Sequence, residues 1–416
     1  MPDPFTFLKR LTRNNCTFLL HRAAMRLGYG NRLQRLSNRD MFNRPEWFWG
    51  QSPVPRLPVV TPPSTDELGL SDKKRLVEDL ITSFNEAIKL DPDNSSYSRL
   101  WATIINRSAN GVVMALIQKD AGALLSLLER MFPLPALWGI GYGDLGLTQG
   151  DRFASFVILD QLVGLAECLG VVRSECPEQG EIGYAFVDGV EKIVADIEQK
   201  LGIKIDFPKI GGSYGLQIGD RLLDMQTPSH IYAAHRLKVN LARYTNESHP
   251  SVLEIGAGFG GAAYWFMKQA KAREYVILDL ALTNVYQGWF LSNALGRDKV
   301  ALYSEINRGI KVGDKLVSIL PTKSESHLAG KRFTGIFNQD SFPEMPEESV
   351  MGYLRLAVDH LDGVVFSYNQ EAYSPVGHKP QPWVHERAQR VEGLTLVSRE
   401  RSWLRRGYIE EIYQKK

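Results

Sequence analysis

The chain has 416 residues, of which 44% are apolar and 23% are charged, and its formal net charge is +2. This length predicts two domains, or one domain with a long extension, and the near-neutral charge argues against a nucleic-acid partner. The three cysteines, Cys16, Cys168 and Cys176, match no zinc or redox spacing and argue against a disulfide framework, as in a reducing compartment.

The first predicted element is a basic arm at residues 9–44, which is rich in arginine and nearly free of acidic residues. One interpretation is a solvated or helix-packing arm; the other is an amphipathic anchor for an anionic membrane face or a protein partner. No secretory signal and no run of about 18 apolar residues is found. We therefore expect a cytoplasmic protein, with peripheral association at the inner membrane face as the variant that the arm suggests.

A proline-rich stretch at residues 52–72 predicts a linker, with a domain boundary near residue 65. Beyond it, apolar residues recur at helical spacing, so residues 66–206 are predicted to form a helical domain. Glycines and short apolar runs at 207–225 then predict a hairpin or an irregular loop. The expected organisation is an arm and linker at 1–65, a helical domain at 66–206 and a third region at 207–416.

The third region alternates strands with helices, which predicts βαβ units and a doubly wound, Rossmann-like parallel α/β sheet. The predicted strands are 251–255, 274–280, 315–321, 333–341 and 363–369, and the predicted helices are 230–244, 261–270, 281–295 and 348–361. The last two apolar segments, 394–403 and 407–415, have no helix between them. They are predicted to form an antiparallel hairpin at the edge of the sheet.

The segment "SVLEIGAGFGGAAYW", residues 251–265, passes from an apolar strand through a glycine-rich turn into a helix. Gly256, Gly258 and Gly261 fit the spacing G-x-G-x-x-G, which suits dinucleotides and S-adenosylmethionine alike. A side chain at Gly256 or Gly258 would push the turn away from a ligand. With Gly260, these glycines are the predicted backbone contacts of a nucleotide-like cofactor.

Two acidic residues help to decide between the two candidate ligands, a dinucleotide and S-adenosylmethionine. Glu254 lies at the carboxyl end of the first strand, where it can reach an ammonium group, which S-adenosylmethionine has and NAD lacks. Asp279 ends the next strand, at the separation expected for a carboxylate that binds ribose hydroxyls. A dinucleotide fingerprint also usually lies in the first βαβ unit, whereas about 250 residues precede this one. The competing interpretation is that both are surface carboxylates and the glycines only permit tight packing.

The stretch "VLEIGAGFGG" followed by "YVILDLALTNVYQGWFLS" resembles class I S-adenosylmethionine-dependent methyltransferases, and this likeness covers residues 229–416. "FNQDSFPEMPEESVMGYLRLA" and "VFSYNQE" are similar to sugar O-methyltransferases of bacterial polysaccharide and natural-product pathways. That narrower likeness rests on Asn338, Ser341, Glu344, Met345 and Asn369. Gly-Ala-Gly stands where that family often has Gly-Gly-Gly, and the resemblance says nothing of residues 1–200.

The resemblance implies methyl transfer from S-adenosylmethionine to a hydroxyl of a sugar-containing acceptor, with Asn338 among the cofactor residues. A sugar hydroxyl is a poor nucleophile, so a base or a metal must help to remove its proton. Asp340 is the first candidate and Glu344 the second. Both also fit the start of a helix, with Asp340 or Ser341 as its cap. A divalent metal is not indicated, because no histidine or further carboxylate stands at a ligand spacing.

Other polar residues remain candidates. Tyr232 and Arg236, on the predicted helix before the glycine strand, are predicted to reach the carboxylate of the cofactor; the alternative is plain helix packing. The rival bases are His230, His327 and His378. The predicted loop that holds His378 and His385 carries aromatic and polar residues suited to contact with a sugar, and the alternative is that it is only a connection. Tyr214 has the same two interpretations, and His235 has no distinct assignment. Two other functions stay open, a NAD(P)-dependent reductase and a catalytically degenerate methyltransferase fold that serves as an assembly subunit.

Overall fold

The computed structural model describes residues 43–44, 47, 54–65, 68–93, 95–105, 109–137, 139–176, 178–180, 183–371 and 381–416. Most of the basic arm, including Cys16, lies outside these ranges, and so does His378. No helix of the described chain is long and apolar enough to cross a membrane.

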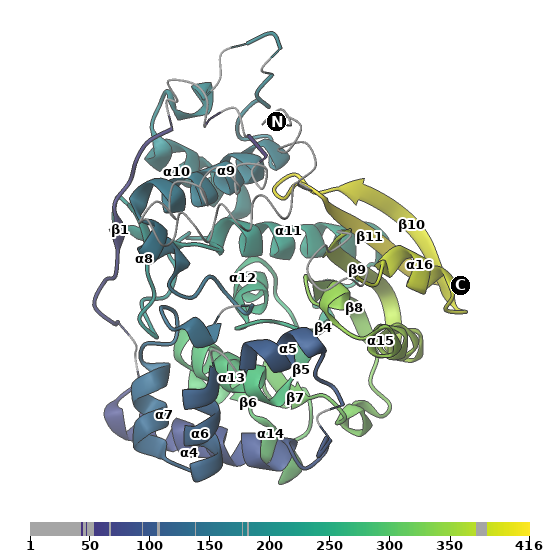
Figure 1. Ribbon diagram of the computed structural model, residues 1–416. Coiled ribbons are helices and arrows are strands. Elements are labelled where there is room, and N and C mark those ends of the chain that lie inside the picture. Colours follow the sequence, from purple (N-terminus) through teal and green to yellow (C-terminus); the bar gives the residue numbers. More distant parts are fainter. Residues whose placement is uncertain are drawn as a thin grey trace, which may run out of the picture.

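The centre of the molecule is an eight-stranded sheet of order β10-β11-β9-β8-β4-β5-β7-β6 (Figure 1). The strands are β4 (Ser251–Ile255), β5 (Glu274–Asp279), β6 (Val300–Ala301), β7 (Val317–Pro321), β8 (Phe333–Gln339), β9 (Leu361–Gln370), β10 (Leu394–Arg401) and β11 (Tyr408–Lys415). Strands β4 to β9 pair in parallel, and β11 pairs antiparallel with both β9 and β10. Every residue of β4, β5, β7 and β8 is buried, as their continuous apolar runs require in a parallel sheet covered on both faces. The predicted doubly wound α/β fold and its edge hairpin are confirmed.

The helices of this region connect the strands and cover the sheet. They are α11 (Thr227–Tyr244), α12 (Gly261–Gln269), α13 (Ala281–Leu295), α14 (Tyr303–Asn307), α15 (Glu347–His360) and α16 (Val384–Gln389). From β4 the chain passes to β5, then to β6 at the sheet edge and back to β7, which lies between β5 and β6. Strand β8 then lies on the other side of β4, and the chain continues from it through β9 to the hairpin. The order therefore reverses between β4 and β8, which is where open α/β sheets bind their ligands.

The N-terminal half is helical, as expected. Its helices are α4 (Leu70–Ala87), α5 (Arg99–Ile104), α6 (Asn110–Gln118), α7 (Ala121–Leu128), α8 (Leu145–Gln149), α9 (Asp151–Cys168) and α10 (Val190–Leu201). Helix α4 packs against α13 and α14, whereas α9 packs against α11, so the helices cover the sheet domain at two places (Figure 1). Their buried apolar side chains join those of the sheet in one continuous core. The division near residue 206 stays a prediction.

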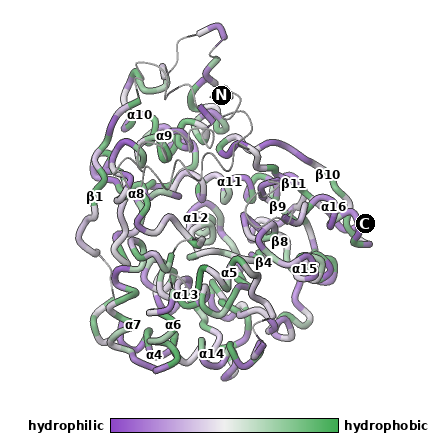
Figure 2. The backbone as a smooth tube through the Cα atoms, viewed as in Figure 1, coloured by the Kyte–Doolittle hydropathy of each residue, from purple (hydrophilic) through white to green (hydrophobic). Residues whose placement is uncertain are grey.

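The proline-rich stretch is packed where the structure describes it. Within it, β1 (Val59–Val60) pairs with β2 (Gly215–Ile218), whose hairpin partner is β3 (Arg221–Asp224). The backbone N–H of Leu57 also donates to Ser155 Oγ at 3.0 Å. This stretch therefore forms an edge strand, and the hairpin predicted at 207–225 is confirmed. Strands β1, β2 and β3 form a separate three-stranded sheet. Figure 2 shows that the β10–β11 hairpin, at one edge of the eight-stranded sheet, is largely hydrophilic.

Candidate active site

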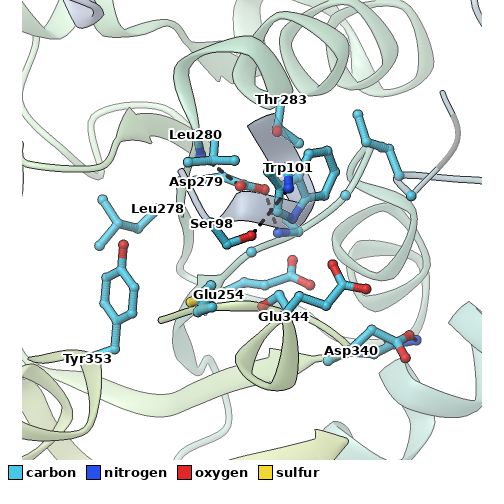
Figure 3. A pocket seen from close by; sticks show the side chains of 18 of the residues that line it. Ser98, Trp101, Glu254, Leu278, Asp279, Leu280, Thr283, Asp340, Glu344 and Tyr353 are labelled. Carbon is cyan, nitrogen blue, oxygen red and sulfur yellow. Dashed lines mark hydrogen bonds between the residues drawn. The ribbon is translucent and has the colours of Figure 1, made fainter. Parts of the chain in front are cut away.

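A cavity of about 850 Å³ opens at the carboxyl ends of β4, β5, β8 and β9, at the point where the strand order reverses. Segments of the helical half complete its wall, namely residues 95–101 at the start of α5, residues 139–142 and Gln161 of α9. Figure 3 shows ten of the lining side chains with labels, among them Glu254, Asp279, Asp340 and Glu344. With Gly256 and Gly258, the cavity thus brings six of the predicted site residues together.

The glycine turn comes close to its neighbours in a backbone conformation that side chains disfavour. Gly256 has φ +74° and Gly258 has φ +58°. A Cβ atom on Gly256 would stand 2.2 Å from Ser341 Oγ, and one on Gly258 would stand 3.2 Å from the carbonyl oxygen of Ile140. Both residues line the cavity. Glycine is therefore required at both positions for the turn to keep its shape at the cavity wall.

The other two glycines of the motif do not line the cavity. A Cβ atom on Gly260 would meet the side chain of Leu291 at 3.0 Å, and one on Gly261 would come within 2.2 Å of His230 Nδ1. Both were predicted to contact a cofactor. The structure gives them a packing role instead, because they let α12 approach α13 and α11.

Asp279 fixes the glycine turn from the neighbouring strand. Its Oδ2 accepts hydrogen bonds from Ala257 N at 2.8 Å and Gln287 Nε2 at 2.7 Å, and its Oδ1 accepts one from Leu280 N at 2.7 Å. Burial raises its pKa to about 6, against the effect of these hydrogen bonds. The carboxylate lines the cavity and keeps lone pairs for a ligand hydroxyl.

Glu254 is a buried carboxyl group at the bottom of the cavity, with a fractional exposure of 1%. Burial raises the pKa of Glu254 to about 8, and the charge of the nearby Asp279 adds to this rise. A hydrogen bond from Tyr275 at 2.8 Å acts in the opposite direction and lowers the pKa. No lysine or arginine of the described chain forms an ion pair with it. A carboxyl group in this state would ionise when a positive charge is placed beside it. We call Glu254, Gly256, Gly258 and Asp279 the glycine-turn half of the cavity.

The opposite side of the cavity is built around an ion pair. Asp340 follows β8 with φ +64°, an uncommon conformation for a residue with a side chain, and its N–H donates to the carbonyl oxygen of Tyr368 at 3.1 Å. Its Oδ2 lies 2.6 Å from Arg405 Nη1. Arg405 also donates to Tyr408 Oη and lies over the Tyr408 ring. Asp340 is thus held by a guanidinium group.

Glu344 is the second predicted catalytic residue, and it ends a short 3₁₀ helix at Phe342–Glu344. Burial, followed by the charge of Asp340, raises its pKa to about 7, while a hydrogen bond from Trp101 and the charge of Arg405 oppose the rise. Its carboxyl group is therefore poised near neutral pH. We call Asp340, Glu344, Arg405, Tyr408 and Gln161 the hairpin half of the cavity.

The alternative that these residues cap a helix is not what the structure shows. Helix α15 begins at Glu347 after Pro346, and the 3₁₀ helix has no side-chain cap. Ser341 Oγ donates to the carbonyl oxygen of Ile255 at 3.1 Å, and Asn338 Nδ2 donates to the same oxygen at 2.7 Å. Asn338 does not line the cavity. Instead of contacting a cofactor, as predicted, it ties the end of β8 to the end of β4.

Two further predicted cofactor residues lie away from the cavity. Tyr232 Oη donates to Glu410 of β11, and Arg236 Nε lies 2.6 Å from Glu410 Oε2. Arg236 Nη2 also lies 2.9 Å from Glu400 Oε2. These residues join α11 to the edge hairpin, so the prediction that they reach the cofactor carboxylate is wrong in position.

Of the rival histidines, His230 lines the cavity. It is buried, its Nδ1 has no hydrogen-bond partner among the residues that the structure describes, and burial lowers its pKa to about 4. It is neutral at pH 7 and a weak base. His327 contacts the Tyr303 ring and lines a separate open cleft.

The remaining candidates have structural partners. His385 Nδ1 lies 3.0 Å from Glu411 Oε1, and burial lowers the pKa of His235, which lies outside the cavity, to about 4. Tyr214 Oη donates to the carbonyl oxygen of Gly143 at 2.6 Å. Within the described ranges, no group of three or more histidine, cysteine, aspartate or glutamate side chains could hold a metal ion.

Sequence reasoning missed Arg405 and Tyr408. A signal for them existed: β11 runs antiparallel to β9, and its first residue, Tyr408, pairs with Gln370 at the carboxyl end of β9. The turn between β10 and β11 must therefore lie at the edge of the sheet where the parallel strands end. Trp101, which also lines the cavity, had no such signal, because it reads as one apolar position of an ordinary helix.

No protein-family profile matches the sequence, and no protein with a curated description matches it. Several of the solved structures that resemble part of the chain are methyltransferases. The CcbJ methyltransferase from Streptomyces caelestis is 15% identical, with 45% of this chain and 90% of that chain covered and a TM-score of 0.32. A methyltransferase from Pyrococcus furiosus is 16% identical over 53% of this chain and 91% of that chain, with a TM-score of 0.29.

A glycopeptide N-methyltransferase, MtfA, complexed with sinefungin is 12% identical, with 45% of this chain and 94% of that chain covered and a TM-score of 0.31. Identities and TM-scores this low do not carry a function across. The doubly wound assignment rests on the strand order of the sheet itself.

Proposed function

We propose that this protein is an S-adenosylmethionine-dependent methyltransferase. The observation that carries the proposal is the position of Glu254, a buried carboxyl group without a cationic partner in the described chain, beside the positive-φ glycines at the switch point of the sheet. A ligand with fixed positive charge supplies what this carboxyl lacks. NAD(P)H offers no cation at that place, so the charge of the site favours S-adenosylmethionine over the reductase alternative.

The residues present fit this cofactor. Asp279 would accept hydrogen bonds from the ribose hydroxyls, and Glu254 would face the amino-acid portion. The backbone at Gly256 and Gly258 would lie against the ligand, where a Cβ atom would already clash with the protein. When bound, S-adenosylmethionine supplies an electrophilic methyl group. Asp279 and the glycine turn would orient it toward the hairpin half, and positioning of this kind can supply much of the rate enhancement.

We further propose that the acceptor is a hydroxyl of an uncharged, sugar-containing molecule. The charged side chains that line the cavity in the described chain are six carboxyl groups and two cations: Glu254, Asp279, Glu325, Asp340, Glu344 and Glu348 against Lys323 and Arg405. Arg405 is paired with Asp340. A phosphate or a uronic acid would meet mainly negative charge here, whereas a polyol can hydrogen-bond to the carboxylates and pack on Trp101 and Tyr408.

Glu344 supports the chemistry better than Asp340. A general base works best with a pKa near the operating pH, and the pKa of Glu344 is about 7. Glu344 would accept the proton of the acceptor hydroxyl. Asp340 would instead hold Arg405, whose free N–H groups can bind the acceptor.

The test has two stages. S-adenosylmethionine and NADPH are compared by thermal shift and calorimetry, and only the first should bind. Methyl-labelled S-adenosylmethionine is then incubated with neutral glycosides, uronic acids and sugar phosphates, and label should appear in a neutral glycoside. Binding of NADPH alone would establish the reductase alternative. Tight binding of S-adenosylmethionine with no labelled acceptor of any class would support the degenerate assembly subunit.

A further inference from the structure

Two residues of the N-terminal arm, Asn43 and Arg44, lie between helix α9 and the turn that joins β10 to β11. The backbone N–H groups of Asn43 and Arg44 donate to Asp160 Oδ2 and Oδ1, each at 3.0 Å. The Asn43 side-chain amide donates on the other side to the carbonyl oxygen of Leu404, and it lies 3.4 Å from that of Trp403. These two residues, which we call the arm clamp, thus bridge α9 and the hairpin turn.

The arm clamp bonds to each of these two elements at the residue that directly precedes a cavity-lining residue. Asp160 precedes Gln161, and Leu404 precedes Arg405, and both Gln161 and Arg405 line the cavity. The arm clamp therefore connects the backbone of two walls of the hairpin half. It bonds to no residue of the glycine-turn half.

The attachment to α9 is extensive. Arg44 has a fractional exposure of 7%, its Nη1 donates to the carbonyl oxygen of Asp160 at 3.0 Å, and it forms ion pairs with Glu167 and Glu175. The indole of Trp47 donates to Glu175 Oε2 at 3.0 Å. Since buried charges are costly to leave unpaired, this side of the arm clamp is firmly fixed.

Fewer hydrogen bonds attach the arm clamp to the hairpin turn than to α9. Ser402 Oγ accepts the N–H groups of Leu404 and Arg405, both at 3.1 Å, and lies 2.8 Å from Tyr368 Oη. These bonds tie the turn to β9. The turn also packs on α9, because a Cβ atom on Gly164 would stand 2.9 Å from the carbonyl oxygen of Trp403, and the Trp403 N–H donates to Tyr232 Oη at 3.3 Å. The Asn43 amide adds the hydrogen bond to the residue that precedes Arg405, so its loss would loosen the turn at that point, while Arg44 stays attached to α9.

We infer that Asn43 is a positioning residue, which holds the hairpin turn so that the Arg405 guanidinium meets Asp340 in the hairpin half. The placement of Arg405 by Asn43 depends only on the fold, whereas its effect on the acceptor rests on the proposed function. A purely structural role for Asn43 predicts a loss of stability alone. A positioning role predicts a selective change at Arg405 and in acceptor affinity.

The variant is Asn43→Ala in the full chain, with Asn43→Ser as a milder second variant. Asn85→Ala is the matched control, because the Asn85 amide also donates to two carbonyl oxygens, of Ile81 and Leu116 at 2.9 Å each, and is half-buried on α4. Arg405 is probed by its rate of modification with phenylglyoxal, located by peptide mass spectrometry. Cofactor affinity is measured by calorimetry with S-adenosylmethionine.

In Asn43→Ala, modification of Arg405 should become about 5- to 10-fold faster, as expected for one lost hydrogen bond, with S-adenosylmethionine affinity within about twofold of wild type. The KM for the neutral glycoside identified as acceptor should rise by a similar factor, with a smaller change in kcat. Asn85→Ala should change none of these. Unchanged labelling of Arg405 in both Asn43 variants, whatever the melting temperature, would overturn the inference. If no glycoside is methylated, the proposed function fails while the labelling still decides the role of Asn43.

Discussion

The two halves of the cavity differ in how they are assembled. The glycine-turn half comes from one βαβ unit, residues 251–283, in which Glu254, the glycines and Asp279 follow one another along the chain. The hairpin half draws on α9, the end of β8 and the β10–β11 turn, which are separated by about 180 and 65 residues. Local backbone geometry therefore decides the first half, and tertiary packing decides the second.

The halves also differ in charge. In the hairpin half the protein supplies its own cation, since Arg405 lies 2.6 Å from Asp340. In the glycine-turn half the carboxyl groups of Glu254 and Asp279 are buried and form no ion pair with a lysine or arginine of the described chain, and burial raises the pKa of each. One half is thus electrostatically complete, whereas the proposed function has the other half completed by a positively charged ligand. The four predictions below test this contrast, from the largest expected effect to the smallest.

The largest effect is expected from Glu344→Gln, which keeps the size of the side chain and removes the base. Turnover should fall by about 10²–10⁴, while S-adenosylmethionine affinity and melting temperature stay near wild type. Because burial raises the pKa of Glu344 to about 7, the carboxylate is lost as the pH falls. The wild-type rate should therefore drop below about pH 7, and the residual rate of the variant should lack that limb. Initial rates across pH measure both effects.

Glu348→Gln is the control for that experiment, because Glu348 also lines the cavity but is exposed at its rim. It should retain nearly full turnover. If Glu344→Gln works as fast as wild type and Asp340→Asn does not, the base is Asp340, and the hairpin half uses its ion pair in the proton transfer itself.

The second effect concerns the glycine-turn half alone. Gly256→Val should weaken S-adenosylmethionine binding by about 100-fold or more, because a side chain there meets Ser341 and the backbone has φ +74°. Gly170→Ala is the control: Gly170 has φ +67° but nothing within 4 Å of its Cβ position, so only the strain is added. Calorimetry on both folded variants separates the two causes. Equal affinities would show that the turn does not approach the ligand.

The contrast explains what the sequence could predict. The alternation of apolar runs predicted β4, β5, β7, β8, β9 and the hairpin, but not the two-residue strand β6. The glycine spacing with Glu254 and Asp279 predicted one half of the cavity, because each of these patterns depends on neighbours in the chain. Tyr232 and Arg236 were misplaced because their direction depends on how α11 packs against β11, where Glu410 takes both. No local pattern encodes such packing. The roles of Arg405 and of the arm residue Asn43 depend on contacts across hundreds of residues.

A third, smaller effect is expected from Asp279→Ala. Loss of charge-assisted hydrogen bonds to the ribose should cost about 1.5–3 kcal/mol, which weakens S-adenosylmethionine binding by about 10- to 100-fold. Asp279 also holds Ala257 and Leu280, so the variant could act through the turn alone. To separate these two roles, the affinities of wild type and of Asp279→Ala are measured for adenosine and for 2′,3′-dideoxyadenosine, which lacks the ribose hydroxyls. The four affinities form a double cycle. If the two ligands lose equal affinity in Asp279→Ala, Asp279 shapes the turn and does not bind the ribose.

The smallest expected effect is the pH dependence of S-adenosylmethionine binding that the ionisation of Glu254 causes. In the free protein its pKa is about 8, so at pH 7 the group is mostly protonated. A cationic ligand favours the carboxylate, so binding of S-adenosylmethionine at pH 7 should release close to one proton. Its affinity should rise with pH up to about 8, by at most tenfold per unit. Calorimetry in two buffers of different ionisation enthalpy measures the proton release, and Glu254→Gln should abolish it.

Adenosine is the control ligand, because it is uncharged and should bind without releasing that proton.

The raised pKa of Glu254 also affects the stability of the fold, and the sign of this effect is opposite to that of a salt-bridged carboxylate. Because the folded state holds the Glu254 proton more tightly than the unfolded state does, stability from this group is lost as the pH rises from about 4 toward 8. Glu254→Gln should therefore flatten the fall in melting temperature over that range when no ligand is bound. Two results together would contradict this: melting temperatures of the variant and wild type that change with pH in the same way, and binding of S-adenosylmethionine to wild type without proton release. Glu254 would then already be ionised in the free protein. The glycine-turn half would then need no charge from its ligand, and the electrostatic contrast between the two halves would disappear.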